Sequence, residues 1–388
     1  MIRTVSVGID VGTYATRVVV VEYLKNDPIP KIIGTGIAES KGLRHGYVVN
    51  IHEASNSIKK AITEAEKSSG IKIKRAFLSI GGVSLSSEIG VGSAVISKAD
   101  GEITSFDIAK AISEMEENLK IPNKKVLESL PMAFKIDGKE TFGQAIGMKG
   151  AKLEVKTLFV TYLAQHLEDL LSTVGESGIE VIDIVASPLS SARVALTDRQ
   201  KTAGCVLVDI GSETVSMAVF EDNKVMTMHV FSIGSTDITN DIALGLKIPL
   251  EEAEGIKTGS VLGNYPQRKL DQIIEARLSD IFELVDNHLK KIKRSELLPA
   301  GAIIVGGGSN IAMIENLAKS MLRLPVTCAT GDNLKIVSGK VRDSSWFPAL
   351  GLCLAGKDET SDSIGGSFGS SIRSAKNLFG SLMKQLLP

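Results

Sequence analysis

The chain has 388 residues, of which 43% are hydrophobic and 23% charged, with 44 basic side chains against 45 acidic ones. This length suggests two to three domains, and the apolar fraction is sufficient for a buried core in each, which excludes disorder, collagen and a coiled coil as descriptions of the whole chain. A net charge of −1 provides no overall basic field, so we expect no nucleic-acid partner.

Cysteine usage and hydropathy bear on the location of the protein. The three cysteines lie far apart and form no CxxC pair, which fits a reducing cytoplasm. The first apolar run contains Asp10, which a signal-peptide core would not tolerate, and no stretch approaches about 18 uncharged apolar residues. We therefore predict a chain that is neither secreted nor membrane-spanning.

A repeated pattern provides the first specific indication of the fold. Residues 5–22 align with residues 204–221, and in each copy an apolar run ends in Asp-x-Gly-(Ser/Thr), with Asp10 or Asp209, before a second apolar run begins. This pattern is typical of a β-hairpin with a carboxylate at its turn. Because about 200 residues separate the copies, far more than in a solenoid repeat, we predict two related lobes that face each other.

Helix and strand signals alternate between and after these hairpins, which predicts mixed α/β lobes. The expected elements are a helix at 53–69, a strand at 76–82, a helix at 106–119, strands at 126–136 and 153–161, a helix at 272–293, a strand at 302–305 and a helix at 310–321. The expected domains are a first lobe of 1–82 and 162–200, an inserted interaction subdomain of 83–161, a second lobe of 201–356, a flexible linker of 357–374 and an amphipathic helix of 375–388.

The two Asp-x-Gly turns are the candidate functional elements. One such turn is weak evidence because ordinary hairpins use it too. Two opposed turns can hold a polyphosphate through backbone N–H groups and hydroxyls, while Asp10 and Asp209 hold Mg²⁺ through water. A run of Gly306, Gly307, Gly308 and Ser309 between a strand and a helix adds a place where a base or ribose can lie against backbone, although it is also compatible with a simple tight turn.

These features resemble the superfamily of actin, sugar kinases and heat-shock chaperone ATPases. Over nearly its whole length the chain is more specifically similar to the FtsA family of bacterial cell-division proteins, and the segments that carry this resemblance are residues 42–48, 147–154, 233–243 and 250–257. The resemblance implies an actin-like, two-lobed duplicated α/β fold with a nucleotide cleft, with ATP and Mg²⁺ as ligands.

The resemblance also implies a role for individual residues. The residues that it places at the nucleotide are Asp10, Gly12, Thr13, Tyr14, Arg17, Asp209, Gly211, Ser212, Glu213, Thr214, Gly234, Ser235, Glu254, Lys257, Gly307, Gly308 and Ser309. Arg17 stands where lysine is usual, although an exposed strand arginine is the simpler interpretation. Glu254 and Lys257 are equally compatible with a surface ion pair.

Two departures from the superfamily pattern concern catalysis. Glu213 and Ser216 replace the third glycine and the final aspartate of the second loop, and residues 187–191 offer no glutamine to orient a water. The sequence does not determine whether Glu213 repels a γ-phosphate or recruits magnesium. ATP binding is therefore better supported than ATP turnover, and we assign no catalytic residue.

The C-terminal residues form a second, independent signal. Leu378, Phe379, Leu382, Met383, Leu386 and Leu387 share one face of a helix, and basic residues flank that face. Such a helix on a flexible linker is typical of attachment to an anionic membrane; the alternative is a helix docked on this or another chain.

The resemblance implies a polymerising scaffold that tethers the tubulin-like protein FtsZ and recruits later division proteins. It also implies filaments of the chain itself, and a location at the division site on the inner face of the cell membrane, where the anionic lipids are bound. Two alternatives remain open. One is a cytoplasmic type IV pilus assembly protein similar to PilM, and the other is a small-molecule kinase, which would need an acceptor site and a catalytic base.

Overall fold

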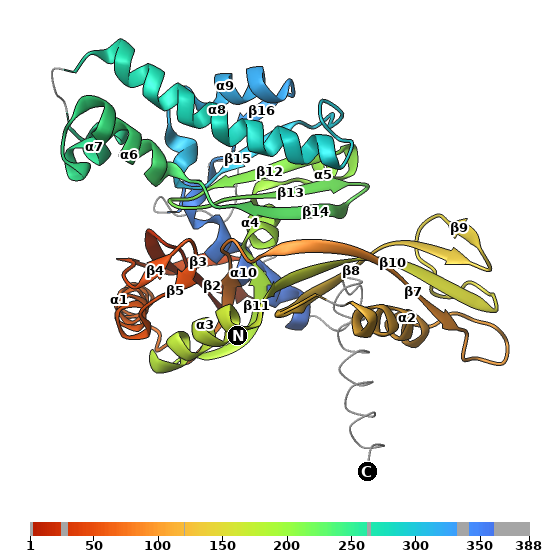
Figure 1. Cartoon of the computed structure of the whole chain (residues 1–388). Helices are drawn as coiled ribbons and strands as arrows, with labels where there is room; N and C mark the ends of the chain where they lie inside the picture. Colours follow the sequence, from red (N-terminus) through yellow and green to blue (C-terminus); the bar gives the residue numbers. More distant parts are fainter. Residues whose placement is uncertain (1–2, 25–29, 120, 262–264, 332–340, 361–388) are drawn as a thin grey trace.

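The computed structural model describes residues 3–24, 30–119, 121–261, 265–331 and 341–360. It has two stacked lobes and a third part that extends to one side (Figure 1). The first lobe contains a five-stranded sheet of order β11-β6-β1-β2-β3. Its strands are β1 (Arg3–Val11), β2 (Ala15–Leu24), β3 (Lys31–Glu39), β6 (Arg75–Ile80) and β11 (Glu180–Ala186).

The second lobe repeats this arrangement with the strand order β16-β15-β12-β13-β14. Its strands are β12 (Cys205–Ile210), β13 (Val215–Glu221), β14 (Lys224–Phe231), β15 (Ala302–Val305) and β16 (Val326–Cys328). In both sheets an antiparallel meander of three strands is followed by two parallel strands, and β1 pairs with β6 as β12 pairs with β15. The predicted duplication is therefore confirmed in the strand order.

Helices cover both sheets. Those of the first lobe are α1 (Ile51–Ser69), α3 (Ala164–Glu176) and α4 (Ser187–Ala195), and those of the second are α5 (Asp198–Ala203), α6 (Ser235–Leu246), α7 (Leu250–Lys257), α8 (Gln267–Lys291) and α9 (Ile314–Leu322). Helix α1 shows why such segments fold: its Asn50 cap accepts a hydrogen bond from the Glu53 N–H, its apolar residues recur on one buried face, and Gly70 ends it in the left-handed region.

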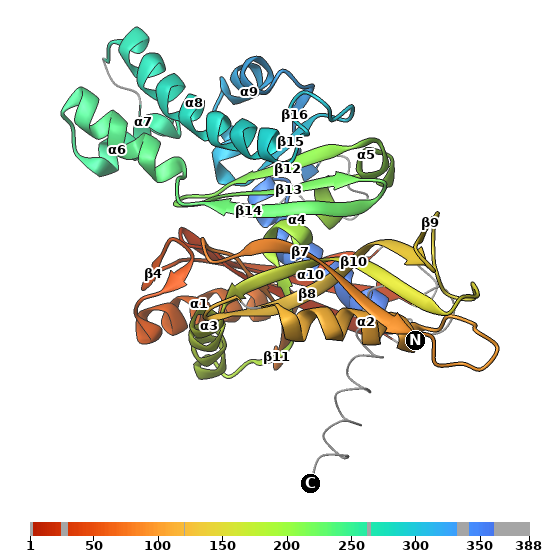
Figure 2. The same ribbon diagram turned by 45° about the vertical axis from the view of Figure 1, so that its right-hand side comes forward.

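The inserted part is a sheet with one covering helix and a core of its own. It contains β7 (Ser86–Val95), α2 (Ser105–Asn118), β8 (Lys124–Ile136), β9 (Lys139–Thr141) and β10 (Lys152–Leu163). Its core includes Ile108, Ile112, Phe134, Leu153 and Phe159. One bridge, between Ser86 of β7 and His229 of β14, joins this sheet to that of the second lobe, so that nine strands follow one another (Figure 2).

The last described helix corrects one predicted boundary. Helix α10 (Phe347–Thr360) was expected in the second lobe, but it packs on β1, β2, β6 and α4 of the first. Gly8 permits this approach, because a Cβ there would lie 2.1 Å from the Ala349 carbonyl oxygen. After the second lobe, the chain thus returns to the first lobe. Helix α10 also runs past Gly356 to Thr360, into the segment expected as a linker; the rest of that linker and the helix expected at 375–388 lie outside the described residues.

Candidate functional site

A cleft of about 890 Å³ lies where the turns of both hairpins meet. Its walls also include the start of α6, helix α7 and a short 3-10 turn at Gly307–Asn310. The residues singled out from the sequence that line it are Asp10, Gly12, Thr13, Tyr14, Arg17, Asp209, Gly211, Ser212, Thr214, Ser235, Glu254, Lys257, Gly307 and Gly308. Segments far apart in the sequence therefore contribute to one site.

Three of the singled-out residues do not line this cleft, and each has a different task. The Glu213 carboxylate accepts a hydrogen bond from the His45 N–H of the first lobe. Gly234 lies against backbone, since a Cβ there would come within 2.3 Å of the Ser212 carbonyl oxygen. The Ser309 hydroxyl donates to the Gly306 carbonyl oxygen at 2.7 Å and so braces the glycine turn.

The two hairpin carboxylates have unusual protonation equilibria. Burial raises the pKa of Asp10, although a hydrogen bond from the Ser79 hydroxyl and the Arg17 charge oppose the rise. Burial, together with the negative charge of Asp10, raises the pKa of Asp209 to about 7, against the opposing effects of Ser191 and Arg17. The free cleft thus holds two desolvated carboxyl groups whose simultaneous ionisation is unfavourable.

These properties fit a magnesium–nucleotide complex. A divalent cation would relieve the repulsion between Asp10 and Asp209, and both residues lie at the turns that were expected to hold it. The Nε of Arg17 is buried without a hydrogen-bond partner, which makes it a donor available to an anionic group. A Cβ at Gly307 would meet nothing within 4 Å, so the backbone of that turn is open to a ligand.

The raised pKa of Asp209 predicts how the stability of the nucleotide-free chain depends on pH. A carboxyl group whose folded pKa exceeds its unfolded value favours the folded state when protonated. Its contribution is complete below the unfolded pKa of about 4 and is lost as the pH rises through about 7. We therefore expect urea denaturation to give a lower unfolding free energy at pH 7.5 than at pH 5.5.

The substitution Asp209→Asn should remove most of that pH dependence, because the amide does not titrate. Asp198→Asn is the matched control, since the Asp198 side chain is exposed at the start of α5. An equal pH dependence in the wild type and in Asp209→Asn would contradict the assigned cause.

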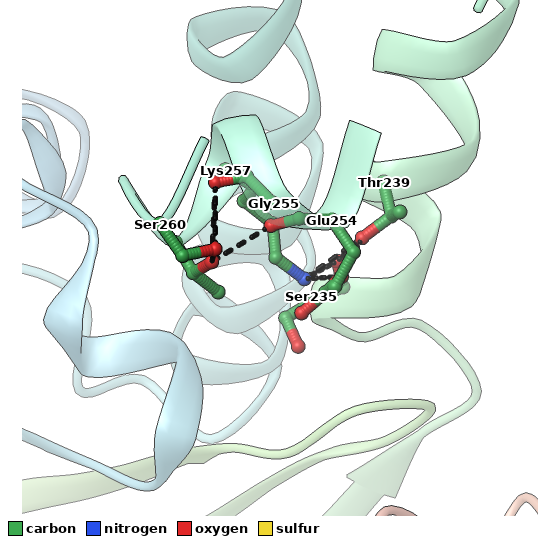
Figure 3. A network of polar contacts seen from close by, with 7 residues as sticks. Ser235, Thr239, Glu254, Gly255, Lys257 and Ser260 are labelled. Atoms are coloured by element: carbon green, nitrogen blue, oxygen red, sulfur yellow. Dashed lines mark hydrogen bonds and ion pairs between the residues drawn. The ribbon is translucent and has the colours of Figure 1, made fainter. Parts of the chain in front are cut away.

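A polar network fixes helix α7 against helix α6 at one wall of the cleft (Figure 3). The Lys257 Nζ lies 2.7 Å from the Glu254 carboxylate, and donates to the Ser235 carbonyl oxygen at 3.0 Å and to the Thr239 hydroxyl at 2.8 Å. Only 8% of the Lys257 side chain is exposed. Lys257 and Glu254 are thus not a freely solvated ion pair: Lys257 positions the carboxylate at the cleft wall.

Some lining residues were missed by the sequence analysis. The clearest is Asp343, which precedes a 3-10 turn at Ser344–Trp346. Although burial opposes it, hydrogen bonds from Ser345 and Asn310 hold the pKa of Asp343 below its ordinary value. No motif surrounds Asp343 in the sequence, so no local signal pointed to it. Gly46 and Gly82 also line the cleft, and only the latter stood at a predicted strand end.

Two lobes with the same strand order, whose Asp-bearing hairpins meet at one cleft, define an actin-like protein. Solved structures agree: the PilM-PilN type IV pilus biogenesis complex matches with a TM-score of 0.68 and 17% identity, over 90% of this chain and 98% of that one. MreB5 of Spiroplasma citri bound to ADP matches with a TM-score of 0.54 and 12% identity, over 92% and 98%.

Sequence comparisons identify the family within this class. The family model "Cell division protein FtsA" matches residues 206–351, and "SHS2 domain inserted in FTSA" matches residues 82–161. Cell division protein FtsA of Pseudomonas aeruginosa is 30% identical over 92% of this chain and 90% of its own length. That of Bacillus subtilis is 29% identical over 89% and 82%. The chain belongs to the FtsA family of cell division proteins.

Family membership weighs against the two alternative functions. The structural similarity to PilM is at 17% identity and shows a shared fold, whereas both family models that match are those of FtsA.

No helix within the described ranges is both long and apolar enough to cross a membrane.

Proposed function

We propose that this chain is an ATP-binding, polymerising scaffold that tethers an FtsZ-like tubulin homologue to the inner face of the cell membrane and recruits later division proteins. The observation that carries the nucleotide part is the pair of carboxylates, Asp10 and Asp209, on two duplicated hairpins at one cleft. A related fold occurs in an MreB structure bound to AMPPNP, which supports the same ligand class here.

In this proposal each part of the cleft binds one part of Mg·ATP. The backbone N–H groups and hydroxyls of Thr13 and Ser212 face the phosphates, and Arg17 supplies positive charge. Glu254 and the open backbone at Gly307 face the nucleoside. The magnesium ion would neutralise phosphate charge, and Asp10 and Asp209 would bind its water ligands.

The inserted subdomain is proposed to make contacts with other chains. None of its described residues lines the cleft. On β7, the side chains of Ile89, Val91 and Val95 lie on one face of the strand and are 51%, 57% and 70% exposed. Apolar groups that alternate in this way on a strand are typical of a surface that another chain covers.

Hydrolysis is expected to be slow or absent even though ATP binds. Ser187 lines the cleft in the segment where a water-orienting glutamine is usual, and Ser216, paired with Asp209 across the hairpin, replaces an aspartate. Phosphate release by the full chain should therefore stay far below the roughly 10 per second of an ordinary enzyme. Turnover near that rate would favour the kinase alternative.

Cosedimentation with anionic liposomes tests the proposal as a whole. The full chain is compared with a chain that ends at Thr360, the last residue of α10, each with and without Mg·ATP. We expect the full chain to sediment with the liposomes, more so with ATP, and the shortened chain to stay in solution. Equal sedimentation of the two chains would contradict membrane tethering by the C-terminal residues.

A further inference from the structure

One tight turn lies between the two phosphate-facing hairpin turns and the place where the inserted subdomain begins. It is the turn His45–Gly46, which joins the short strands β4 (Leu43–Arg44) and β5 (Tyr47–Val48). Both turn residues have positive φ, 49° for His45 and 83° for Gly46. Positive φ at both central residues is what a two-residue hairpin turn of this kind requires, and histidine is among the non-glycine residues that adopt it more readily.

On one side, the turn bonds to both lobes of the cleft. The Gly46 N–H donates to the Thr13 hydroxyl of the first hairpin turn at 3.1 Å. The His45 N–H donates to the Glu213 carboxylate of the second hairpin turn, and the His45 ring Nδ1 lies 3.2 Å from the Glu213 carbonyl oxygen. Glu213 stands where relatives of this fold were expected to have glycine, so this second bond depends on a side chain that such a glycine lacks.

On its other side, the turn bonds to the root of the inserted subdomain, which we define as residues 82–85 before β7 and 164–166 after β10. The His166 Nε2 lies 2.9 Å from the Gly46 carbonyl oxygen, and the His166 Nδ1 lies 3.1 Å from the Ser84 hydroxyl. Because a carbonyl oxygen only accepts, Nε2 carries the proton and Nδ1 accepts from Ser84.

The packing around the turn leaves little room for independent movement. His166 is 2% exposed, and its ring lies 4.6 Å from that of Tyr47. A Cβ added to Gly46 would lie 2.5 Å from the Gly82 Cα, so the two backbones are in direct contact. If the turn moves, β7 and β10, which lead into and out of the inserted subdomain, must therefore move with it.

We propose that the His45–Gly46 turn transmits the nucleotide state of the cleft to the inserted subdomain, with Glu213 and His166 as the positioning residues at its two ends. The proposal rests on the nucleotide binding proposed above. Phosphates held between the two hairpin turns change the separation of Thr13 and Glu213, and the turn follows because it is bonded to both. Coupling of this kind is reciprocal, so contacts made by the inserted subdomain would change the affinity for ATP by the same factor.

Hydrogen exchange of the full chain with and without saturating Mg·ATP tests this transmission, alongside calorimetric measurement of ATP binding. In the wild type we expect the exchange rates of amides in β7 and β10 to change at least about fivefold on addition of ATP, the lower end of ordinary allosteric couplings. In Glu213→Ala and in His166→Ala the change should disappear, while calorimetry still detects ATP binding.

Two further variants separate transmission from loss of folding. His166→Gln keeps a side-chain N–H donor for the Gly46 carbonyl oxygen and should restore the response. Glu221→Ala removes a carboxylate of the same strand pair that binds Arg294 instead, at 2.8 Å, and should respond like the wild type. If His166→Ala does not fold, Glu213→Ala tests the proposal alone.

The outcomes distinguish this inference from the function on which it rests. No ATP binding by the wild type would overturn both. ATP binding with an unchanged response in Glu213→Ala, or without any response in the wild-type β7 and β10, would overturn the transmission and leave nucleotide binding intact.

Discussion

Replacing Asp209 with alanine is expected to remove most of the stabilisation that Mg·ATP confers on the chain. A ligand that binds only the folded state at about 100 times its Kd adds about 2.7 kcal/mol of stability. In Asp209→Ala the cleft loses one of the two carboxylates that would hold the magnesium ion, so the rise in melting temperature on addition of Mg·ATP should fall close to zero.

The same substitution should not destabilise the nucleotide-free chain at neutral pH. Because burial and the charge of Asp10 raise the pKa of Asp209 to about 7, its ionisation in the free cleft is unfavourable. Removal of the carboxyl group relieves that repulsion, so the melting temperature without nucleotide should be equal or higher at pH 7.5. A variant that melts lower without ATP and yet shows the full shift with ATP would contradict the assigned role.

Replacing Phe379 and Leu382 with glutamate is expected to release the protein from anionic membranes. Each apolar side chain contributes about 1.5–3 kcal/mol when buried, and each glutamate adds repulsion from the lipid head groups. Liposome sedimentation should therefore fall at least about tenfold. These positions lie outside the described residues, so this expectation rests on the sequence pattern.

A matched double variant tests whether position or charge explains such a loss. Asn377 and Ser381 lie on the opposite face of the same expected helix, so Asn377→Glu with Ser381→Glu adds identical charge without removing apolar surface. We expect that variant to keep most of its binding. Equal loss in both double variants would indicate an electrostatic attachment, and no loss in either would move the helix to a protein-docking role.

Membrane binding should also depend on assembly. A single amphipathic helix binds reversibly and weakly, whereas several helices on one filament multiply the apparent affinity. Sedimentation with liposomes should thus rise more steeply than linearly with protein concentration.

The local features of this protein could be predicted from its sequence, and the features that depend on contacts distant in the chain could not. The two hairpins were predictable because an apolar run, an Asp-x-Gly turn and a second apolar run specify them within about 20 residues. Helices such as α1 and α8 were predictable from their apolar periodicity, with ends that differ by a few residues from those observed.

The position of α10 shows where such reasoning fails. Nothing near residues 347–360 in the sequence indicates that they pack on β1, whose residues lie more than 300 positions earlier. Helix α10 carries apolar residues on every side, and such a pattern indicates burial without indicating the partner. The predicted second lobe, residues 201–356, therefore wrongly included the start of α10.

The candidate site also has some residues that the sequence predicted and others that it did not. Asp10 and Asp209 stood out because the duplication placed them in register, and the structure brings both to one cleft. The Glu213 carboxylate, in contrast, binds the His45 N–H; residues 42–48 carried the family resemblance, but no hairpin was predicted there. Their roles toward a nucleotide remain predictions.

The direction of α10 bears on how the proposed nucleotide site lies relative to the residues that follow Thr360. Pro348, at the start of the helix, lines the cleft, whereas the Cys353 thiol already lies beside the Ser6 carbonyl oxygen, four residues before Asp10 on β1. The helix rises about 18 Å from Pro348 to Thr360. Thr360 therefore lies about 18 Å along the helix from a residue that lines the cleft. We therefore propose that nucleotide exchanges at the cleft while the protein stays attached, and that ATP acts on attachment through assembly.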